Sequence, residues 1–520
     1  MFKNHPKGLL TAALSNMGER FGYYIMNAVL ILFLCSKFGL SDGVSGGIAS
    51  AFLTMIYILS LVGGFVADKT SNYKGTITVG LIMMSLGYVL LAIPITATDT
   101  NQSWLLPFTC AALFIIALGN GLFKGNLQAI VGQMYDNLEE EAANNGTLDK
   151  VKGYRDSGFQ IFYVFINVGA LIAPFVAPYL RSWWLGQNGF TYNAKLPALC
   201  HKFIENASTL TTEEMSNIKT WCAEVTNGTV AEPTVEFCNQ YLEVFNTGVH
   251  YSFWASVLAM TISLVIFLLN KKNFPTPSKK EASAVAEYTA EEKKTMADEI
   301  RQRMYALFAV LGIAIFFWFS FHQNGQSLSI FARDFVDTSS IAPEIWQAVN
   351  PFFVIVLTPV VMAILSALAN KGIVFSTPRK IAIGMLIAAI AFCVLLVVAL
   401  ANGYPSGEVF NALPAAEQNA MKSGSWVLIT VYFFLTVAEL FISPLGLSFV
   451  SKVAPKHLQG LCQGLWLGAT AVGNGLIWMG PVMLGAWPQS ICWAVFMGVC
   501  LLSMAVMLGM VKWLERVTNA

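Results

Sequence analysis

Charged residues are scarce in this sequence: lysine, arginine, aspartate and glutamate make up 12% of its 520 residues. A soluble domain carries roughly 25%. The mean hydropathy is +0.60, and apolar runs of the ~20 residues that a membrane span needs recur along the whole chain. The formal net charge of +1 says nothing about a nucleic-acid partner, and we expect none. The composition therefore predicts a polytopic α-helical membrane protein.

The sequence also lacks the residue patterns of an enzyme. It shows no nucleophile–base pair and no phosphate-binding loop, and its cysteine and histidine spacings fit no zinc site. No small-residue cleavage site follows the basic residues at the N-terminus, so we expect the first apolar run to be retained. We expect neither catalysis nor a metal or organic cofactor.

Twelve apolar runs predict twelve spans. Their approximate ranges are 8–36, 45–67, 76–97, 104–131, 157–181, 250–270, 304–331, 347–369, 379–401, 425–450, 459–484 and 490–512. Lysine and arginine gather after the even-numbered spans, except the fourth, and are sparse in most of the other loops. Because basic residues stay on the cytoplasmic side of a membrane, both termini are expected in the cytoplasm.

Two long polar segments divide the chain. The expected units are a first six-helix bundle (1–181 with 250–270), an extracytoplasmic insertion (182–249), a cytoplasmic linker (271–303) and a second six-helix bundle (304–520). In the linker, Thr289 with Glu292 has a capping-box pattern, and Glu299 with Arg303 has the spacing of a helical ion pair, so we expect a helix that runs into the seventh span.

The insertion carries its own structural signals. Thr211 followed by Glu214 predicts a helix start. Cys200, Cys222 and Cys238 lie on the expected oxidising side, so one disulfide with one thiol left over is plausible, and the pairing stays open. The insertion is either a small stapled cap or a partner-binding module. Two sequons, at 206–208 and 227–229, are glycosylation acceptors only in a eukaryotic host.

Six spans on either side of a basic linker are typical of the major facilitator fold, in which the substrate binds at the midplane between two halves. Residues 63–69, Gly-Gly-Phe-Val-Ala-Asp-Lys, resemble the cytoplasmic signature of that superfamily. We expect Asp68 in this stretch to help latch the inward gate rather than bind substrate.

Five ionisable residues fall deep within the predicted spans: Glu19, Arg20, Lys124, His322 and Glu439. Charges at membrane depth face a bundle interior or a water-filled cavity and are functional by default. A cationic wall on the first half and an anionic wall on the second suit a small zwitterion. The alternative is that Glu19–Arg20 and Lys124–Glu439 neutralise each other.

His322 lies mid-span among aromatic residues. Because histidine titrates near physiological pH, it is a candidate proton relay. The alternative is a neutral imidazole that is hydrogen-bonded in the core.

Several motifs carry a resemblance to the proton-dependent oligopeptide transporter family. Residues 16–24, Asn-Met-Gly-Glu-Arg-Phe-Gly-Tyr-Tyr, are similar to its first-span ExxERFxYY motif, and residues 159–170 match its fifth-span signature. Residues 124–126, 350–353, 439–448 and 464–466 resemble further family positions. The motifs fall in both halves and in order, so the resemblance covers nearly the whole chain apart from 182–249.

The resemblance implies uptake of di- and tripeptides driven by the inward proton gradient, in a multi-pass protein of a cell membrane such as the bacterial inner membrane. It implies that Arg20 and Lys124 meet the peptide carboxylate and that Glu439 meets the amino terminus. The residues implied to contact the peptide backbone are Asn167 and Asn350, and those implied to line side-chain pockets are Tyr23, Tyr24, Tyr57, Trp318 and Trp466.

Two positions depart from the family pattern. Asn16 stands where the first-span motif begins with a glutamate, and His322 stands where the seventh span usually carries a carboxylate. Asparagine cannot take up a proton, so coupling would fall on Glu19, His322 and Glu439. The alternatives are a carrier of another small anion or modified amino acid, with altered or lost coupling, and a receptor-like protein that binds through 182–249.

Overall fold

The computed structural model describes residues 5–40, 42–98, 100–151, 153–193, 196–275, 290–325, 327–337, 343–411, 413 and 415–518. Within these residues the fold is helical throughout, with one isolated β-bridge between Val336 and Ser423. Eleven of the described helices are long and apolar enough to cross a membrane, and α1 makes a twelfth if its two arms, bent by 42°, count as one span. The all-α prediction with about twelve spans is confirmed.

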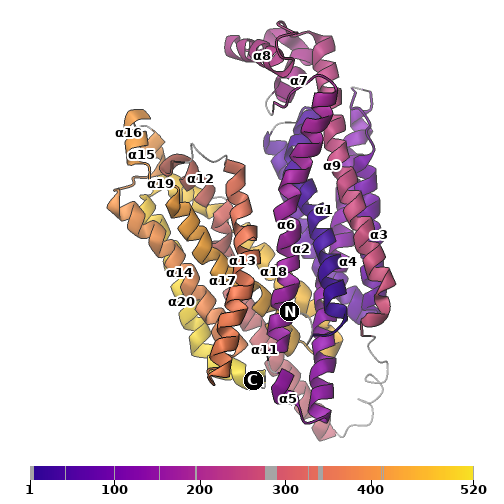
Figure 1. Ribbon diagram of the computed structural model, residues 1–520, viewed down its shortest axis with the longest axis vertical. Coiled ribbons are helices and arrows are strands. Elements are labelled where there is room, and N and C mark those ends of the chain that lie inside the picture. Colours follow the sequence, from indigo (N-terminus) through magenta and orange to yellow (C-terminus); the bar gives the residue numbers. More distant parts are fainter. Residues whose placement is uncertain are drawn as a thin grey trace.

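The long helices form two bundles. The first contains α1 (Gly8–Phe38), α2 (Asp42–Thr70), α3 (Tyr73–Ala92), α4 (Gln102–Asn144), α6 (Tyr154–Gln187) and α9 (Val235–Leu269). The second contains α11 (Ala290–Phe321), α13 (Pro343–Asn370), α14 (Thr377–Ala401), α17 (Trp426–Val453), α18 (Gln459–Gly475) and α20 (Gln489–Val517). Figure 1 shows the bundles standing side by side.

Short helices occupy the two ends of the bundles. They are α5 (Leu148–Val151), α7 (Leu196–Asn206), η1 (Ala207–Thr209), α8 (Thr212–Val225), η2 (Lys271–Asn273), η4 (His322–Gly325), α12 (Ser327–Phe335), α15 (Gly407–Asn411), α16 (Ala415–Met421), η5 (Lys456–Leu458) and α19 (Met479–Ala486). We call the end that carries α7 and α8 the loop face, and the opposite end, with α5, η2 and η5, the linker face (Figure 1).

Several helices are longer than the apolar runs that predicted them. α4 extends to Asn144, where residues 104–131 were predicted, and α6 and α9 shorten the predicted insertion of 182–249 to a connection of 188–234. An α-helix satisfies its own backbone, so it continues past the apolar run wherever the sequence favours helix. α3 ends earlier than predicted, at Ala92, because Pro94 follows and the residue before a proline disfavours helix.

The connection between α6 and α9 folds as a small helical module. Thr211 caps α8, and its hydroxyl accepts from the Glu214 amide while the Glu214 carboxylate accepts from the Thr211 amide, which confirms the predicted capping box. Lys202 and this backbone amide lower the pKa of the Glu214 carboxyl. Cys200 and Cys222 of the module and Cys238 at the start of α9 are buried free thiols, so the predicted disulfide is absent from this structure. The thiols of Cys200 and Cys238 are hydrogen-bonded to each other.

Two spans that were predicted to be continuous are broken. The seventh ends as α11 at Phe321 and continues through η4 into α12, and the eleventh ends as α18 at Gly475 before α19. The breaks contact each other, because the Gln323 amide donates to the Ile477 carbonyl at 3.2 Å. Helices broken within a membrane protein expose backbone groups only where protein or a cavity surrounds them.

The linker is described only in part. Its helix runs into the seventh span as α11, and Glu299 pairs with Arg303 at 2.7 Å, as predicted. Thr289 lies outside the described residues.

Candidate functional site

Arg20 and Glu19 form a bidentate ion pair inside the first bundle. The Arg20 Nε and Nη2 atoms donate to the two Glu19 carboxylate oxygens, each at 2.6 Å, and both side chains are buried. The Asn120 amide of α4 donates to Glu19 Oε1 at 2.5 Å. The Glu19 carboxylate is therefore fully engaged, and the arginine also lies over the ring of Tyr23 at 4.5 Å.

Lys124, one helix turn beyond Asn120 on α4, lies differently. Its ammonium sits 4.6 Å from the centre of the Tyr57 ring, and within the described part of the chain it has no carboxylate partner. Tyr23 and Tyr24 contact each other edge to face, and Tyr24 lies within electrostatic reach of both Arg20 and Glu439. The three tyrosines thus surround the two cations.

Glu439 lies on α17 in the second bundle and is buried. Its carboxylate accepts a hydrogen bond from the Tyr163 hydroxyl of α6, which crosses between the bundles, and one from the Asn350 amide of α13 at 2.8 Å. The predicted Lys124–Glu439 ion pair is absent among these contacts. Each charge is therefore held by neutral groups rather than by the other.

The remaining predicted peptide contacts are distributed around this centre. Asn167 lies one turn from Tyr163 on α6 and donates to its carbonyl at 3.1 Å. Trp466 is buried on α18 and packs closely against Gly446 of α17. Asn16 is buried on α1, one turn before Glu19 and Arg20.

His322 lies at the break between α11 and α12, not in the middle of a continuous span. Its Nδ1 atom is hydrogen-bonded to Asn474 Oδ1, at the end of α18, and its ring stacks on Trp318 at 4.8 Å. Because an amide oxygen only accepts, Nδ1 carries the proton in this arrangement. The histidine therefore ties the two broken spans together.

Asp68 joins the bundles at the linker face. Its carboxylate accepts from the Gly460 amide at 2.9 Å and the Leu461 amide at 2.7 Å, in the first turn of α18, and from the Tyr73 hydroxyl. The first turn of a helix has free N–H groups and a partial positive charge, so a carboxylate is stabilised there.

Glycines bring α2 and α18 into backbone contact beside this carboxylate. A Cβ atom on Gly64 would lie 2.3 Å from the Gly460 carbonyl oxygen, and one on Gly464 would lie 2.8 Å from the Ser60 carbonyl oxygen. Separations under 3.0 Å are not tolerated, so these positions accept only glycine while the bundles are in contact here.

A buried carboxylate forms a second connection at the same face. Asp156 on α6 accepts from Lys380 at 2.7 Å and Lys452 at 3.0 Å, and also from Ser448 at 2.5 Å, all in the second bundle. Its neighbour Arg155 donates to the Ser451 carbonyl at 3.2 Å. These contacts close the linker face.

Sequence reasoning missed several partners of the predicted residues. Asn120, Tyr163 and Asn474 contact Glu19, Glu439 and His322, yet an amide or hydroxyl inside an apolar span is too common to single out. Asp156 carried a usable signal, since it stands with Arg155 directly before the fifth span.

Two helical bundles that enclose buried opposite charges and close at one face define a membrane transporter of the major facilitator fold. Comparison with known proteins identifies the family of this transporter. The profile described as the POT family matches residues 74–490. This chain belongs to the POT family, whose members are transporters and not enzymes.

Curated relatives span almost the full chain. The peptide transporter YePEPT of Yersinia enterocolitica is 28% identical over 91% of this chain and 87% of its own length. Dipeptide and tripeptide permease B of Salmonella typhimurium is 26% identical over 99% and 96%.

Solved structures share the fold. A POT family transporter in complex with a thioalcohol-conjugated peptide has a TM-score of 0.59, with 20% identity, 99% of this chain and 98% of the other covered. A peptide transporter POT in complex with sulfate has a TM-score of 0.58, with 21% identity over 99% and 96%.

The glycine contact at the linker face predicts that Gly64→Ala disfavours the closed arrangement. The added methyl overlaps the Gly460 carbonyl, and overpacking costs about 1–3 kcal/mol. This cost shifts the equilibrium between the closed and the open linker face ~10–100-fold toward the open form. Spin labels at Lys69→Cys and Lys456→Cys, with the partly exposed Cys35, Cys110 and Cys393 replaced, measure that separation.

Gly468→Ala is the matched control on α18, because its Cβ would have only an ordinary contact, 3.8 Å from Leu61. Equal label distances in Gly64→Ala and the parent would contradict the closed contact.

Proposed function

We propose that this transporter takes up di- and tripeptides by proton-coupled symport. One observation carries the proposal: the buried Glu439 and the partly buried Lys124 lie on opposite bundles, and neutral groups rather than each other hold them. Buried charges need a counter-charge, and a peptide zwitterion supplies one to each. Relatives named peptide transporter and dipeptide and tripeptide permease support the same substrate class.

In this proposal the peptide carboxylate binds Arg20 and Lys124. Arginine grips a carboxylate with two parallel hydrogen bonds, whereas lysine acts as a point charge. The peptide amine binds Glu439, while Asn167 and Asn350 contact the backbone. Tyr23, Tyr24, Tyr57, Trp318 and Trp466 line the space for side chains. The tyrosines that surround the two cations support this assignment.

Proton coupling is assigned to Glu19, His322 and Glu439. The bidentate Glu19–Arg20 pair leaves the arginine unavailable to a substrate. A proton on Glu19 weakens that pair and frees Arg20 for the peptide carboxylate. A second proton on His322 leaves its Nδ1–H bond to Asn474 intact and charges the ring at the break in α11. Coupling therefore does not require a glutamate at Asn16.

Transport proceeds by alternating access between faces. We assign the linker face and both termini to the cytoplasm and the loop face to the outside of a cell membrane. The closed linker face then corresponds to an outward-facing protein, with Asp68 as part of the inner gate. Peptide and proton together neutralise the two walls, and this differential binding shifts the balance toward the inward-facing state.

A second candidate is a carrier of a modified amino acid or another small anion. The motivating observation is His322 at the position of a family carboxylate, since a protonated imidazole suits an anion. A POT family transporter of the same fold, at 20% identity, is known in complex with 5-aminolevulinic acid.

Uptake of labelled dialanine into proteoliposomes tests the proposal. We expect accumulation only when an inward proton gradient is imposed, and counterflow without one. Accumulation that is independent of the gradient would contradict symport. The absence of both accumulation and counterflow would contradict the peptide substrate and favour the second candidate.

Lys124→Gln tests the binding orientation. A charge-assisted hydrogen bond contributes about 1.5–3 kcal/mol, so dialanine should compete ~10–100-fold less well in counterflow. Dialanine amide, which lacks the carboxylate, is the matched ligand, and its ability to compete in counterflow should change little in this variant. If both ligands lose competition equally, Lys124 does not bind the peptide carboxylate.

His322→Gln tests the coupling assignment. Glutamine keeps a hydrogen-bond donor for Asn474 but cannot gain a proton, so we expect gradient-driven accumulation to be abolished. Counterflow of the same variant should persist, because it requires binding and exchange alone. Unchanged accumulation would remove His322 from the coupling mechanism.

A further inference from the structure

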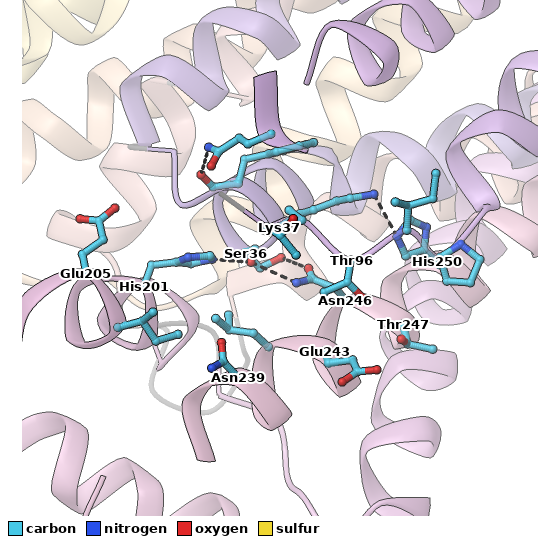
Figure 2. Close-up of a pocket in the computed structure, with 18 residues that line it drawn as sticks. Ser36, Lys37, Thr96, His201, Glu205, Asn239, Glu243, Asn246, Thr247 and His250 are labelled. Atoms are coloured by element: carbon cyan, nitrogen blue, oxygen red, sulfur yellow. Dashed lines mark hydrogen bonds between the residues drawn. The ribbon is translucent and has the colours of Figure 1, made fainter. Parts of the chain in front are cut away.

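A cavity of about 460 Å³ lies at the loop face of the first bundle, outside the contact between the bundles. Residues from the ends of α1 and α9, from the connection between α3 and α4, and from α7 line it, and Figure 2 labels side chains from each of these segments. Its volume falls within the range of small-molecule sites. Lys37 lies 17 residues beyond Arg20 on α1, about 25 Å along the helix, so this cavity is separate from the charges at the midplane.

One end of the cavity holds a buried lysine. The Lys37 ammonium lies 3.3 Å from His250 Nε2 and 5.0 Å from the centre of the Phe33 ring, and both Lys37 and His250 are at most 5% exposed. His250 Nδ1 lies 2.7 Å from the Leu91 carbonyl, so Nδ1 donates and Nε2 accepts from the lysine. The histidine is therefore a neutral partner.

Lys37 lacks a carboxylate partner in the part of the chain that the structure describes. An ammonium has three N–H donors, and His250 accepts one of them. Burial of a cation without a counter-charge is unfavourable. The lysine end of the cavity is therefore suited to an anionic group of a ligand.

Hydrogen bonds hold the cavity wall in place beside the lysine. The Ser36 hydroxyl donates to Asn246 Oδ1 at 2.7 Å, and the Asn246 amide donates back to the Ser36 carbonyl at 3.1 Å. His201 of α7 donates to the same carbonyl through Nε2 at 2.7 Å. The module between α6 and α9 is thus fixed against the bundle as part of the wall (Figure 2).

The other end of the cavity is acidic. Asn239, Glu243, Asn246 and His250 are spaced four, three and four residues apart, so they share one face of α9. Glu243 lies seven residues before His250, about 10 Å along the helix. Glu243 is exposed and makes no ion pair with described residues, while Glu205 of α7 lines the opposite side of the cavity, beyond His201 (Figure 2).

We propose that this cavity binds a short zwitterionic peptide, with its carboxylate at Lys37 and its amine at Glu243. An extended chain spans ~3.3–3.6 Å per residue, so about three residues bridge the ~10 Å between the two ends. The site is additional to the one at the midplane, and its occupancy does not depend on transport. It gives the module between α6 and α9 a role in ligand binding.

Ligand protection of a cysteine in the cavity tests the proposal. Asn239→Cys places an exposed thiol in the wall of the cavity, and Gln240→Cys places one on the next residue of α9, outside it. The rate of maleimide labelling of each is read by site-resolved mass spectrometry on the full-length protein in detergent. We expect trialanine to slow labelling at position 239 at least 5-fold and to leave position 240 unchanged.

The two ends are tested separately. Trialanine amide and N-acetyl-trialanine should protect at least 5-fold less well than trialanine, and Lys37→Gln and Glu243→Gln should each reduce protection similarly. Glu243 is exposed, so its variant tests the site even if Lys37→Gln does not fold. Glu224→Gln, an exposed glutamate on α8 away from the cavity, is the control.

Three results would overturn the second site: no protection at position 239, protection that the blocked peptides give equally, or protection that persists in both cavity variants. If protection at position 239 disappears in the Lys124→Gln protein, the ligand binds at the midplane, and this result would also overturn the second site. Failure of proton-driven dialanine uptake would instead contradict the proposed function and leave the protection result intact.

Discussion

The neutralisation of charge inside the membrane is the constraint on which this structure depends. A carboxylate or a guanidinium there loses its hydration, so each must find partners within the protein. Arg20 and Glu19 meet this demand by pairing with each other, with Asn120 as an additional donor. Glu439 meets it through hydrogen bonds from Tyr163 and Asn350. The Tyr163 bond crosses between the bundles, so the charge balance of the site is coupled to the separation of the two halves.

Carboxylates that bind backbone amides or lysines, together with glycines that allow close helix contact, hold the linker face closed. Asp68 accepts from free N–H groups at the start of α18, while Gly64 and Gly464 allow the helix backbones to touch. Asp156 adds a buried carboxylate that Lys380 and Lys452 share. When the halves separate here, these carboxylates must exchange protein partners for water. The hydration of these carboxylates therefore offsets part of the cost of separating the halves at this face.

Much of this organisation could be predicted from the sequence. Arg20 and Glu439 stand out because charges are rare in apolar runs, and the Thr211–Glu214 cap follows from local chemistry. Hydrogen-bond partners such as Tyr163 could not be predicted, because they depend on how distant helices pack. The break at His322 was also missed, since an apolar run shows composition but not where the helix stops and restarts. The absent disulfide is a similar case, because three buried thiols can lie close together without forming a covalent bond.

Two lysines that have no carboxylate partner among the described residues, Lys124 and Lys37, connect the midplane with the loop face. Arg20 pairs with a carboxylate, as do Lys380 and Lys452 at the linker face. Lys124 and Lys37 instead lie over aromatic rings, at 4.6 Å from Tyr57 and 5.0 Å from Phe33. An aromatic face attracts a cation without removing its capacity to donate hydrogen bonds. Such a lysine remains available to an incoming carboxylate, whereas a lysine already paired with glutamate or aspartate would first have to break that pair. The same physical arrangement at two depths is what both proposed carboxylate sites, at the midplane and at the loop face, require.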